Sequence, residues 1–178
     1  MKLPEKYKWL EEETGPKMLL EAIKLFGTEE KTGTQNNPLI MSWANEIGGA
    51  IKRDYSADSV PWCGLFMGII ARRANKELPT DILWAQNWST FGRLTSKPML
   101  GDILVFKVEN GHGHVALYIG EDAECYHILG GNQSDKVCII RKEKRKVLVA
   151  RRPNYINQPE NVRQIILSPV GEISQSEL

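Results

Sequence analysis

The apolar residues of this chain change their spacing near Pro98. Before that point they recur three and four positions apart, the spacing that gives a helix one buried face. After it they alternate with polar residues, as in strands that are buried on one side. Helices followed by strands, rather than alternating with them, predict an α+β fold.

Three helices are expected in the first half, at residues 19–26, 37–47 and 59–73. The second has a clear beginning, because Asn37 is a good N-cap and Pro38 is tolerated at the first helical position. The third is expected to begin at Ser59 or Val60. That start would place Cys63 in the first turn of the helix.

Five short strands are expected in the second half, in an antiparallel meander. Turn residues separate them at residues 103–108, 114–119, 124–129, 137–140 and 147–151. Residues 16–153 are predicted to form a single domain, a size that buries a core without disulfides. Residues 1–15 are interpreted as an N-terminal extension, and residues 154–178 as a tail or a docked arm.

Composition limits the classes of partner and cofactor. With 23 basic and 22 acidic residues, the net charge of +1 gives no electrostatic case for binding nucleic acid. The polar N-terminus and the absence of an 18-residue apolar run predict a protein made soluble in the cytoplasm, without membrane insertion. Three widely spaced cysteines favour free thiols over disulfides or a structural zinc, and no cofactor is expected.

Cys63 and His114 are candidates for a reactive pair. A helix N-terminus and a nearby imidazolium both lower the pKa of a thiol, so a first-turn cysteine favours nucleophilic chemistry. His114 opens an apolar strand after a glycine-rich turn, about fifty residues later, where it can face a helix packed on the sheet. Each residue also has a plainer interpretation: Cys63 as a small buried apolar residue, and His114 as the cap of a strand.

Four motifs strengthen the catalytic interpretation. They are VPWCGLF at residues 60–66, LGDILVF at 100–106, GHVALY at 113–118 and LGGNQ at 129–133. In this order and spacing they resemble the CHAP and NlpC/P60-like cysteine peptidases, a superfamily of phage and bacterial cell-wall hydrolases. The resemblance covers residues 18–152. It implies a papain-like fold, in which N-terminal helices carrying the nucleophile pack on a C-terminal antiparallel sheet carrying the base.

The resemblance also implies roles for individual residues. Cys63 matches the nucleophile and His114 the general base. A third residue orients the imidazole by accepting a hydrogen bond from its other nitrogen. Asn132 stands close to the position of the CHAP asparagine and is the residue expected in this role. His127 is the alternative, from the NlpC/P60 spacing, although an ordinary strand histidine is the preferred interpretation of it.

Residues just upstream of Cys63 are candidates for binding the oxyanion and the substrate. The backbone N–H of Cys63 is the first expected oxyanion donor, assisted by the side chain of Tyr55 or Asp58. Asp58 is as readily a turn residue, and Tyr55 as readily a packing residue. Trp62 matches a wall of the substrate cleft in the family, or else it fills the core.

The reaction implied by the resemblance is cleavage of an amide bond in the peptide stem of peptidoglycan, through a thioester on Cys63. The expected setting is an endolysin-like enzyme, a monomer that reaches the bacterial cell wall after the membrane is breached in phage lysis. N-acetylmuramoyl-L-alanine amidase activity is slightly favoured over peptide endopeptidase activity. The choice is expected to depend on loops such as residues 84–93.

Three alternatives stand beside this interpretation. The chain could be a secreted amidase effector toxin, a catalytically silent wall-binding or phage structural module, or a thiol acyltransferase.

Other features receive plain interpretations. His112 and His114 form an HxH pair that could bind metal, but a loop histidine is the preferred interpretation. The basic run at residues 141–146 is expected to be a solvated turn, or else a contact for anionic wall polymer. Cys125 and Cys138 are expected to be structural.

Overall fold

The computed structural model describes residues 2–33, 35–107 and 113–168. The α-helices are α1 (Lys17–Lys24), α2 (Pro38–Ile47), α3 (Gly49–Asp54) and α4 (Cys63–Arg73), and the 3-10 helices are η1 (Glu5–Glu12), η2 (Ala85–Thr90) and η3 (Lys144–Lys146). The strands are β1 (Arg93–Thr95), β2 (Ile103–Phe106), β3 (His114–Glu121), β4 (Cys125–Gly130), β5 (Cys138–Glu143) and β6 (Val147–Arg152). The protein is therefore α+β, as the change of spacing predicts.

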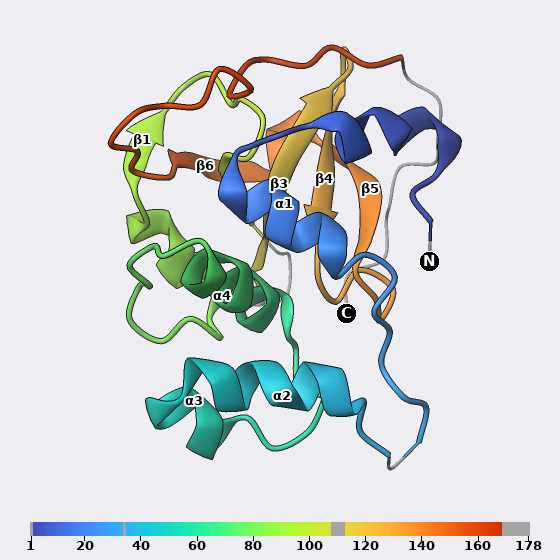
Figure 1. Ribbon diagram of the computed structural model, residues 1–178, viewed down its shortest axis with the longest axis vertical. Coiled ribbons are helices and arrows are strands. Elements are labelled where there is room, and N and C mark those ends of the chain that lie inside the picture. The colour runs from blue at the N-terminus through green and yellow to red at the C-terminus, as the bar shows by residue number, and fades with distance from the viewer. Residues whose placement is uncertain (1, 34, 108–112, 169–178) are drawn as a thin grey trace.

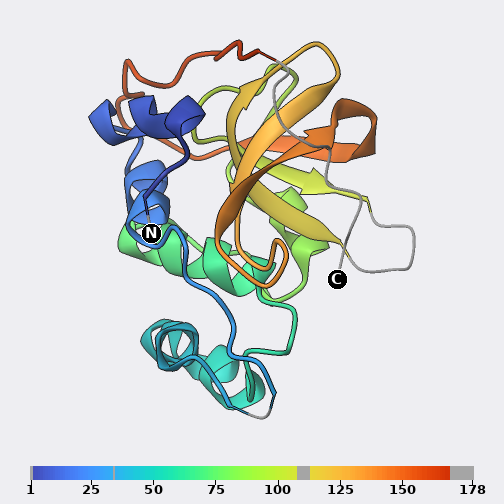
Figure 2. The same cartoon turned by 90° about the vertical axis from the view of Figure 1, so that its right-hand side faces the viewer.

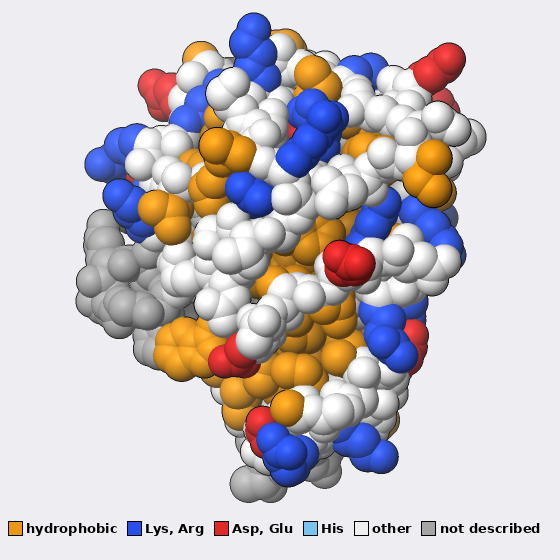
Figure 3. All heavy atoms as spheres, turned by 90° about the vertical axis from the view of Figure 1, so that its left-hand side faces the viewer, with side chains coloured by type: hydrophobic (Ala, Val, Ile, Leu, Met, Phe, Trp, Pro, Cys, Tyr) orange, Lys and Arg blue, Asp and Glu red, His pale blue; other side chains and the backbone are white. Residues whose placement is uncertain are grey.

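The helices lie on one side of the sheet. Helices α1 and α4 pack on it, and α2 and α3 form a separate pair farther from the strands (Figures 1 and 2). Viewed from the side of β1 and α4, hydrophobic side chains reach the surface across the middle of the molecule, with charged side chains mostly around them (Figure 3). None of the helices in the described ranges has the length and apolar character needed to cross a membrane.

The sheet has six strands in the order β1-β6-β2-β3-β4-β5, and all pairings are antiparallel. The predicted meander holds only for β2 to β5, because β6 pairs with β2 and not with β5. Only η3 connects β5 to β6, and three residues span about 10 Å. The sheet must therefore curl until its β5 edge comes close to β6.

Each face of the curled sheet has its own apolar cluster. The larger cluster lies between the helices and the sheet. A smaller one on the other face contains Leu104, Phe106, Ala116, Tyr118, Ile128 and Ala150. Strand β3 is consequently buried on both faces, and its first residue, His114, lies at the border of this packed region.

Two helical predictions need correction. Helix α4 begins at Cys63, three or four residues later than expected, because Pro61 disfavours helical geometry at the residue before it.

The predicted Asn37 cap of α2 is confirmed, since its side chain accepts from the Leu39 N–H at 2.8 Å. Helix α2 ends at Gly48 as predicted, with a φ of 79°, but the unpredicted α3 follows at once.

Both terminal segments pack on the domain as far as they are described. Tyr7 and Leu10 of η1 are buried in the main core. The segment near Ile165 lies beside β3, where the Glu121 N–H donates to the Ile165 carbonyl at 2.9 Å and the Leu167 N–H donates to the Glu121 carbonyl at 2.8 Å. Of the two interpretations of the C-terminal segment, residues 154–168 thus follow the docked arm.

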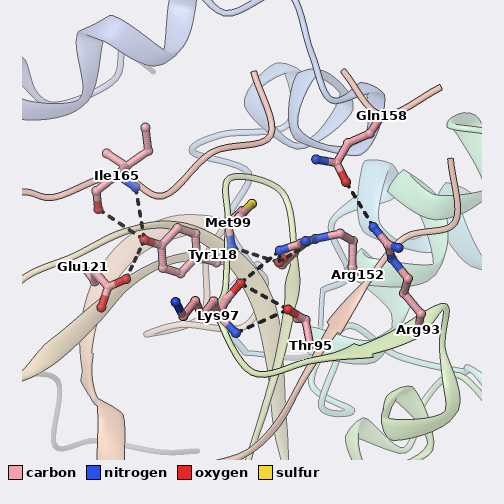
Figure 4. A network of polar contacts seen from close by, with 10 residues as sticks. Arg93, Thr95, Lys97, Met99, Tyr118, Glu121, Arg152, Gln158 and Ile165 are labelled. Carbon is pink, nitrogen blue, oxygen red and sulfur yellow. Dashed lines mark hydrogen bonds and ion pairs between the residues drawn. The ribbon is translucent and has the colours of Figure 1, made fainter. Parts of the chain in front are cut away.

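A buried ion pair joins the turn before β2 to the end of β6. Asp102 is fully buried and accepts hydrogen bonds from Arg152, the shortest at 2.9 Å from Nε and 2.7 Å from the terminal nitrogen. The Met99 N–H also donates to Asp102, and Arg152 donates to the Lys97 carbonyl (Figure 4). The aspartate of the LGDILVF motif therefore has a structural role.

The Asp102–Arg152 pair predicts a stability difference. Asp102→Ala leaves the Arg152 charge buried without its carboxylate, and we expect it to lower the free energy of unfolding by about 3–5 kcal/mol. Chemical denaturation measures the loss. Gln158→Ala is the control, because it removes only an exposed contact to Arg93 and should cost within about 0.5 kcal/mol. Equal losses in the two variants would contradict the prediction.

Candidate functional site

Cys63 is the first residue of α4 and only 6 % exposed. Three backbone N–H groups near the thiol favour its ionised form: its own, that of Gly64 and that of Val115. Burial nevertheless raises the pKa of the Cys63 thiol, although these donors and the charge of Lys142 act in the opposite direction. The lowered pKa expected from helix position alone is therefore not found, because desolvation of the thiolate outweighs the helix N-terminus.

The Val115 N–H brings the thiol close to the backbone that follows His114. Val115 is the second residue of β3 and follows His114 directly. The start of α4 is thus in contact with the start of β3. Closeness of these two elements is one condition for a thiol and a base to act together.

His114 is held by a glutamine. The ring nitrogen Nε2 lies 3.0 Å from Oε1 of Gln133, a side chain that is 4 % exposed. The Gln133 amide nitrogen donates to the Cys138 carbonyl at 2.6 Å, which fixes the orientation of the amide and directs its oxygen to the imidazole. His114 Nε2 must therefore carry a proton, and in the neutral ring Nδ1 has the lone pair.

The loop after β4 carries Gln133 against the start of α4. A Cβ on Gly131 would lie 2.5 Å from Cβ of Phe66 and 2.7 Å from the Trp62 ring, so the close approach requires glycine. The next residue, Asn132, has a φ of 53°. This left-handed turn directs Gln133 inward and leaves Asn132 half-buried, with no side-chain hydrogen bond to the described part of the chain.

Asn132 was the residue expected to contact His114, but the next residue, Gln133, makes this contact. The LGGNQ motif contained the necessary signal, a second amide side chain one residue later. Spacing alone could not distinguish adjacent residues in a turn. Here the backbone conformation of Asn132 decides which amide faces the histidine.

His127, the alternative third residue, lies elsewhere. It pairs with Gly120 on β3, six residues and therefore about 20 Å along the strand from His114. Its side chain is fully buried, with Nδ1 2.7 Å from the Tyr7 hydroxyl and Nε2 2.9 Å from Asp122. Asp122 also accepts from Arg141 at 2.8 Å. His127 thus belongs to a structural network that holds η1 on the sheet.

Tyr55 and Asp58, upstream of Cys63, are buried and hold the segment that leads to it. The Tyr55 hydroxyl donates to the Val60 carbonyl, and the Asp58 carboxylate accepts the backbone N–H groups of Lys31 and Asn37. An accepting carboxylate of this kind cannot donate to an oxyanion. These side chains fix the polypeptide that leads into α4.

Trp62 also belongs to the core. It is fully buried, packs on Trp43 with ring centroids 5.9 Å apart, and donates to Glu30 at 2.5 Å. A side chain without exposed surface does not form a cleft wall in this conformation.

A lysine completes the polar surroundings. Lys142 on β5 is only 3 % exposed, and its Nζ lies 5.3 Å from the centroid of the Phe106 ring. That ring lies 6.2 Å from the ring of His114. The basic run is therefore not simply a solvated turn, because Arg141 and Lys142 are buried.

Two further expectations concern cysteines and metal. Cys125 is buried, and Cys138 is half-buried, with its thiol donating to the Gln133 carbonyl at 3.2 Å. His112, the partner of His114 in a possible metal site, lies outside the described residues. Within them, no three His, Cys, Asp or Glu side chains gather as metal ligands do.

No family model matches the chain, and the search of curated proteins finds no match.

The buried His127 predicts a pH dependence of stability. Burial lowers the pKa of His127, while the Asp122 carboxylate opposes this shift. The unfolded chain therefore takes up a proton near pH 6.5 more readily than the folded protein does, so stability falls as the pH drops below that value. We expect His127→Gln, which cannot titrate, to show a smaller fall in Tm between pH 7.5 and 5.5 than the wild type.

Tyr7→Phe is the control for this measurement. It removes the hydroxyl bonded to His127 but keeps the titrating ring. It should lower Tm while retaining the pH dependence of the wild type. If Tm falls as much in His127→Gln as in the wild type between pH 7.5 and 5.5, groups other than His127 control the loss of stability at low pH.

Proposed function

We propose that this chain is a cysteine-dependent peptidoglycan amide hydrolase with a papain-like fold. One observation carries the proposal: the Cys63 thiol at the start of α4 lies near the Val115 N–H on β3, next in the chain to a His114 that is held by Gln133. The motif resemblance points to the same chemistry. The substrate is the peptide stem of the bacterial cell wall, and the setting is phage lysis after the membrane is breached.

Catalysis begins with proton transfer within the site. Because burial raises the thiol pKa, the thiolate forms when His114 Nδ1 takes the proton. The thiolate then attacks the amide carbonyl, and the backbone N–H of Cys63 stabilises the oxyanion. The protonated His114 gives its proton to the leaving amine, and the acyl group remains on Cys63 as a thioester.

Hydrolysis completes the cycle. His114 removes a proton from water, the resulting hydroxide adds to the thioester carbonyl, and the C–S bond breaks to release the carboxylic acid. The charge of Lys142 favours the thiolate as leaving group. Every step uses side chains and backbone groups of this chain.

Gln133 acts as the positioning residue in this scheme. Its amide oxygen accepts from His114 Nε2, so that Nδ1 remains the basic nitrogen. It takes the role expected of Asn132. A neutral amide stabilises the imidazolium less than a carboxylate would, which suits a base that must also return its proton.

Digestion of purified peptidoglycan tests the proposed function. We expect the wild type to release soluble fragments and Cys63→Ala to release none, with mass spectrometry identifying the new termini. Cys125→Ala is the matched control, since it alters another buried cysteine and should retain activity. New lactyl and L-Ala termini indicate the amidase reaction, and termini within the peptide indicate an endopeptidase.

Two outcomes would contradict the proposal. If wild type and Cys63→Ala both leave several wall types intact, the chain is not a hydrolase of peptidoglycan. If the acyl group passes to an added amine in preference to water, the chain is a thiol acyltransferase.

The pair Gln133 and Asn132 provides a second test. We expect Gln133→Ala to lower kcat by roughly 10-fold or more, because the base loses its orientation. Gln133→Glu should restore most of the activity and move the acidic limb of the kcat/KM pH profile upward, since a carboxylate raises the pKa of the imidazole. Asn132→Gly, which keeps the left-handed turn, should have little effect. The reverse pattern would return the role to Asn132.

A further inference from the structure

Residues 82–86 lie directly against the residue that follows the nucleophile. A Cβ on Gly64 would lie 2.0 Å from the Ile82 carbonyl oxygen and 2.9 Å from that of Leu83. Only glycine allows this backbone contact at the start of α4. The segment therefore begins beside Cys63.

The same segment reaches the residue that precedes the base. A Cβ on Gly113 would lie 2.3 Å from the amide nitrogen of Gln86 and 3.1 Å from Cβ of Ala85. Gln86 also donates to the Phe106 carbonyl at 3.2 Å. Residues 82–86 thus extend from the Cys63 side of the site to the His114 side.

Trp84 lies in the middle of this segment and is 56 % exposed, whereas Ile82 and Ala85 are buried. Its backbone is fixed, because its N–H donates to the Asp81 carbonyl and its carbonyl accepts the N–H of Asn87. The Trp88 indole also donates to the Ile82 carbonyl at 2.9 Å. A large aromatic ring held at the surface by a rigid backbone is a surface suited to binding a ligand.

We propose that Trp84 is a specificity-determining residue, a platform on which the sugar ring adjoining the scissile amide stacks. This inference rests on the proposed function and deepens it. The flat indole offers an apolar face to the C–H surface of a pyranose ring and an N–H donor at its edge. Its place in the chain, between contacts to the two residues flanking Cys63 and His114, puts the sugar next to the reacting carbonyl. The substrate class is then an N-acylated amino sugar that carries the stem peptide, as the amidase reaction requires.

Binding to an inactive protein tests the proposal. In the Cys63→Ala background, calorimetry compares a disaccharide–tetrapeptide wall fragment with the same tetrapeptide without sugar. We expect the sugar-bearing fragment to bind more tightly. Adding Trp84→Ala should weaken its binding by about 10-fold or more while leaving the weaker binding of the peptide unchanged. Trp84→Phe should retain part of the preference.

Leu94→Ala is the matched control. Leu94 is an exposed apolar side chain on β1, and its truncation should change neither affinity. Circular dichroism and Tm confirm that each variant is folded. Equal affinity of Cys63→Ala for the two fragments, no measurable binding of either, or equal weakening of both by Trp84→Ala would overturn the platform.

The two proposals fail separately. If the wild type digests peptidoglycan but Trp84→Ala leaves fragment binding unchanged, the hydrolase proposal is supported and the proposed role of Trp84 is wrong. If the wild type cleaves nothing while Cys63→Ala still prefers the sugar-bearing fragment through Trp84, the platform stands as part of a wall-binding module.

Discussion

The burial of α4 is the constraint on which the rest of this structure depends. Every residue from Cys63 to Ala71 is buried, so the helix contacts neighbours on all sides and not along one stripe. Such a helix needs small residues where other backbone approaches, and Gly64 provides one against Ile82. The same packing holds the first residue of the helix against the beginning of β3.

The curl of the sheet has an equally direct consequence for the site. It gives the strands a second apolar cluster, so β3 is covered on both faces and His114 lies where that cover ends. Phe106 and Lys142 lie on the same side as His114, and Gln133 reaches it from the loop after β4. The polar groups of the site are thus gathered at a border of the core, where the fold limits both their movement and their hydration.

Burial of the Cys63 thiol at this border of the core has two opposite effects on its reactivity. It raises the pKa of the Cys63 thiol, which makes a free thiolate less stable, yet it strengthens each interaction that stabilises the thiolate or an oxyanion. The three backbone N–H groups need no reorganisation to act, because secondary structure already fixes them. In the proposed mechanism the histidine therefore takes the proton as part of the reaction, rather than acting on a cysteine that is already ionised.

The sequence by itself determined the α+β class, most strand positions, the Asn37 cap and the candidate pair Cys63 and His114, because these follow from local spacing, turn chemistry and short motifs. Tertiary structure alone decided what depends on distant contacts. The curl of the sheet moved β6 beside β2, and a left-handed residue at position 132 turned Gln133 rather than Asn132 toward the histidine. Packing buried Trp62 and left Trp84 at the surface, since hydrophobicity is the same for both and only the neighbours of each residue differ.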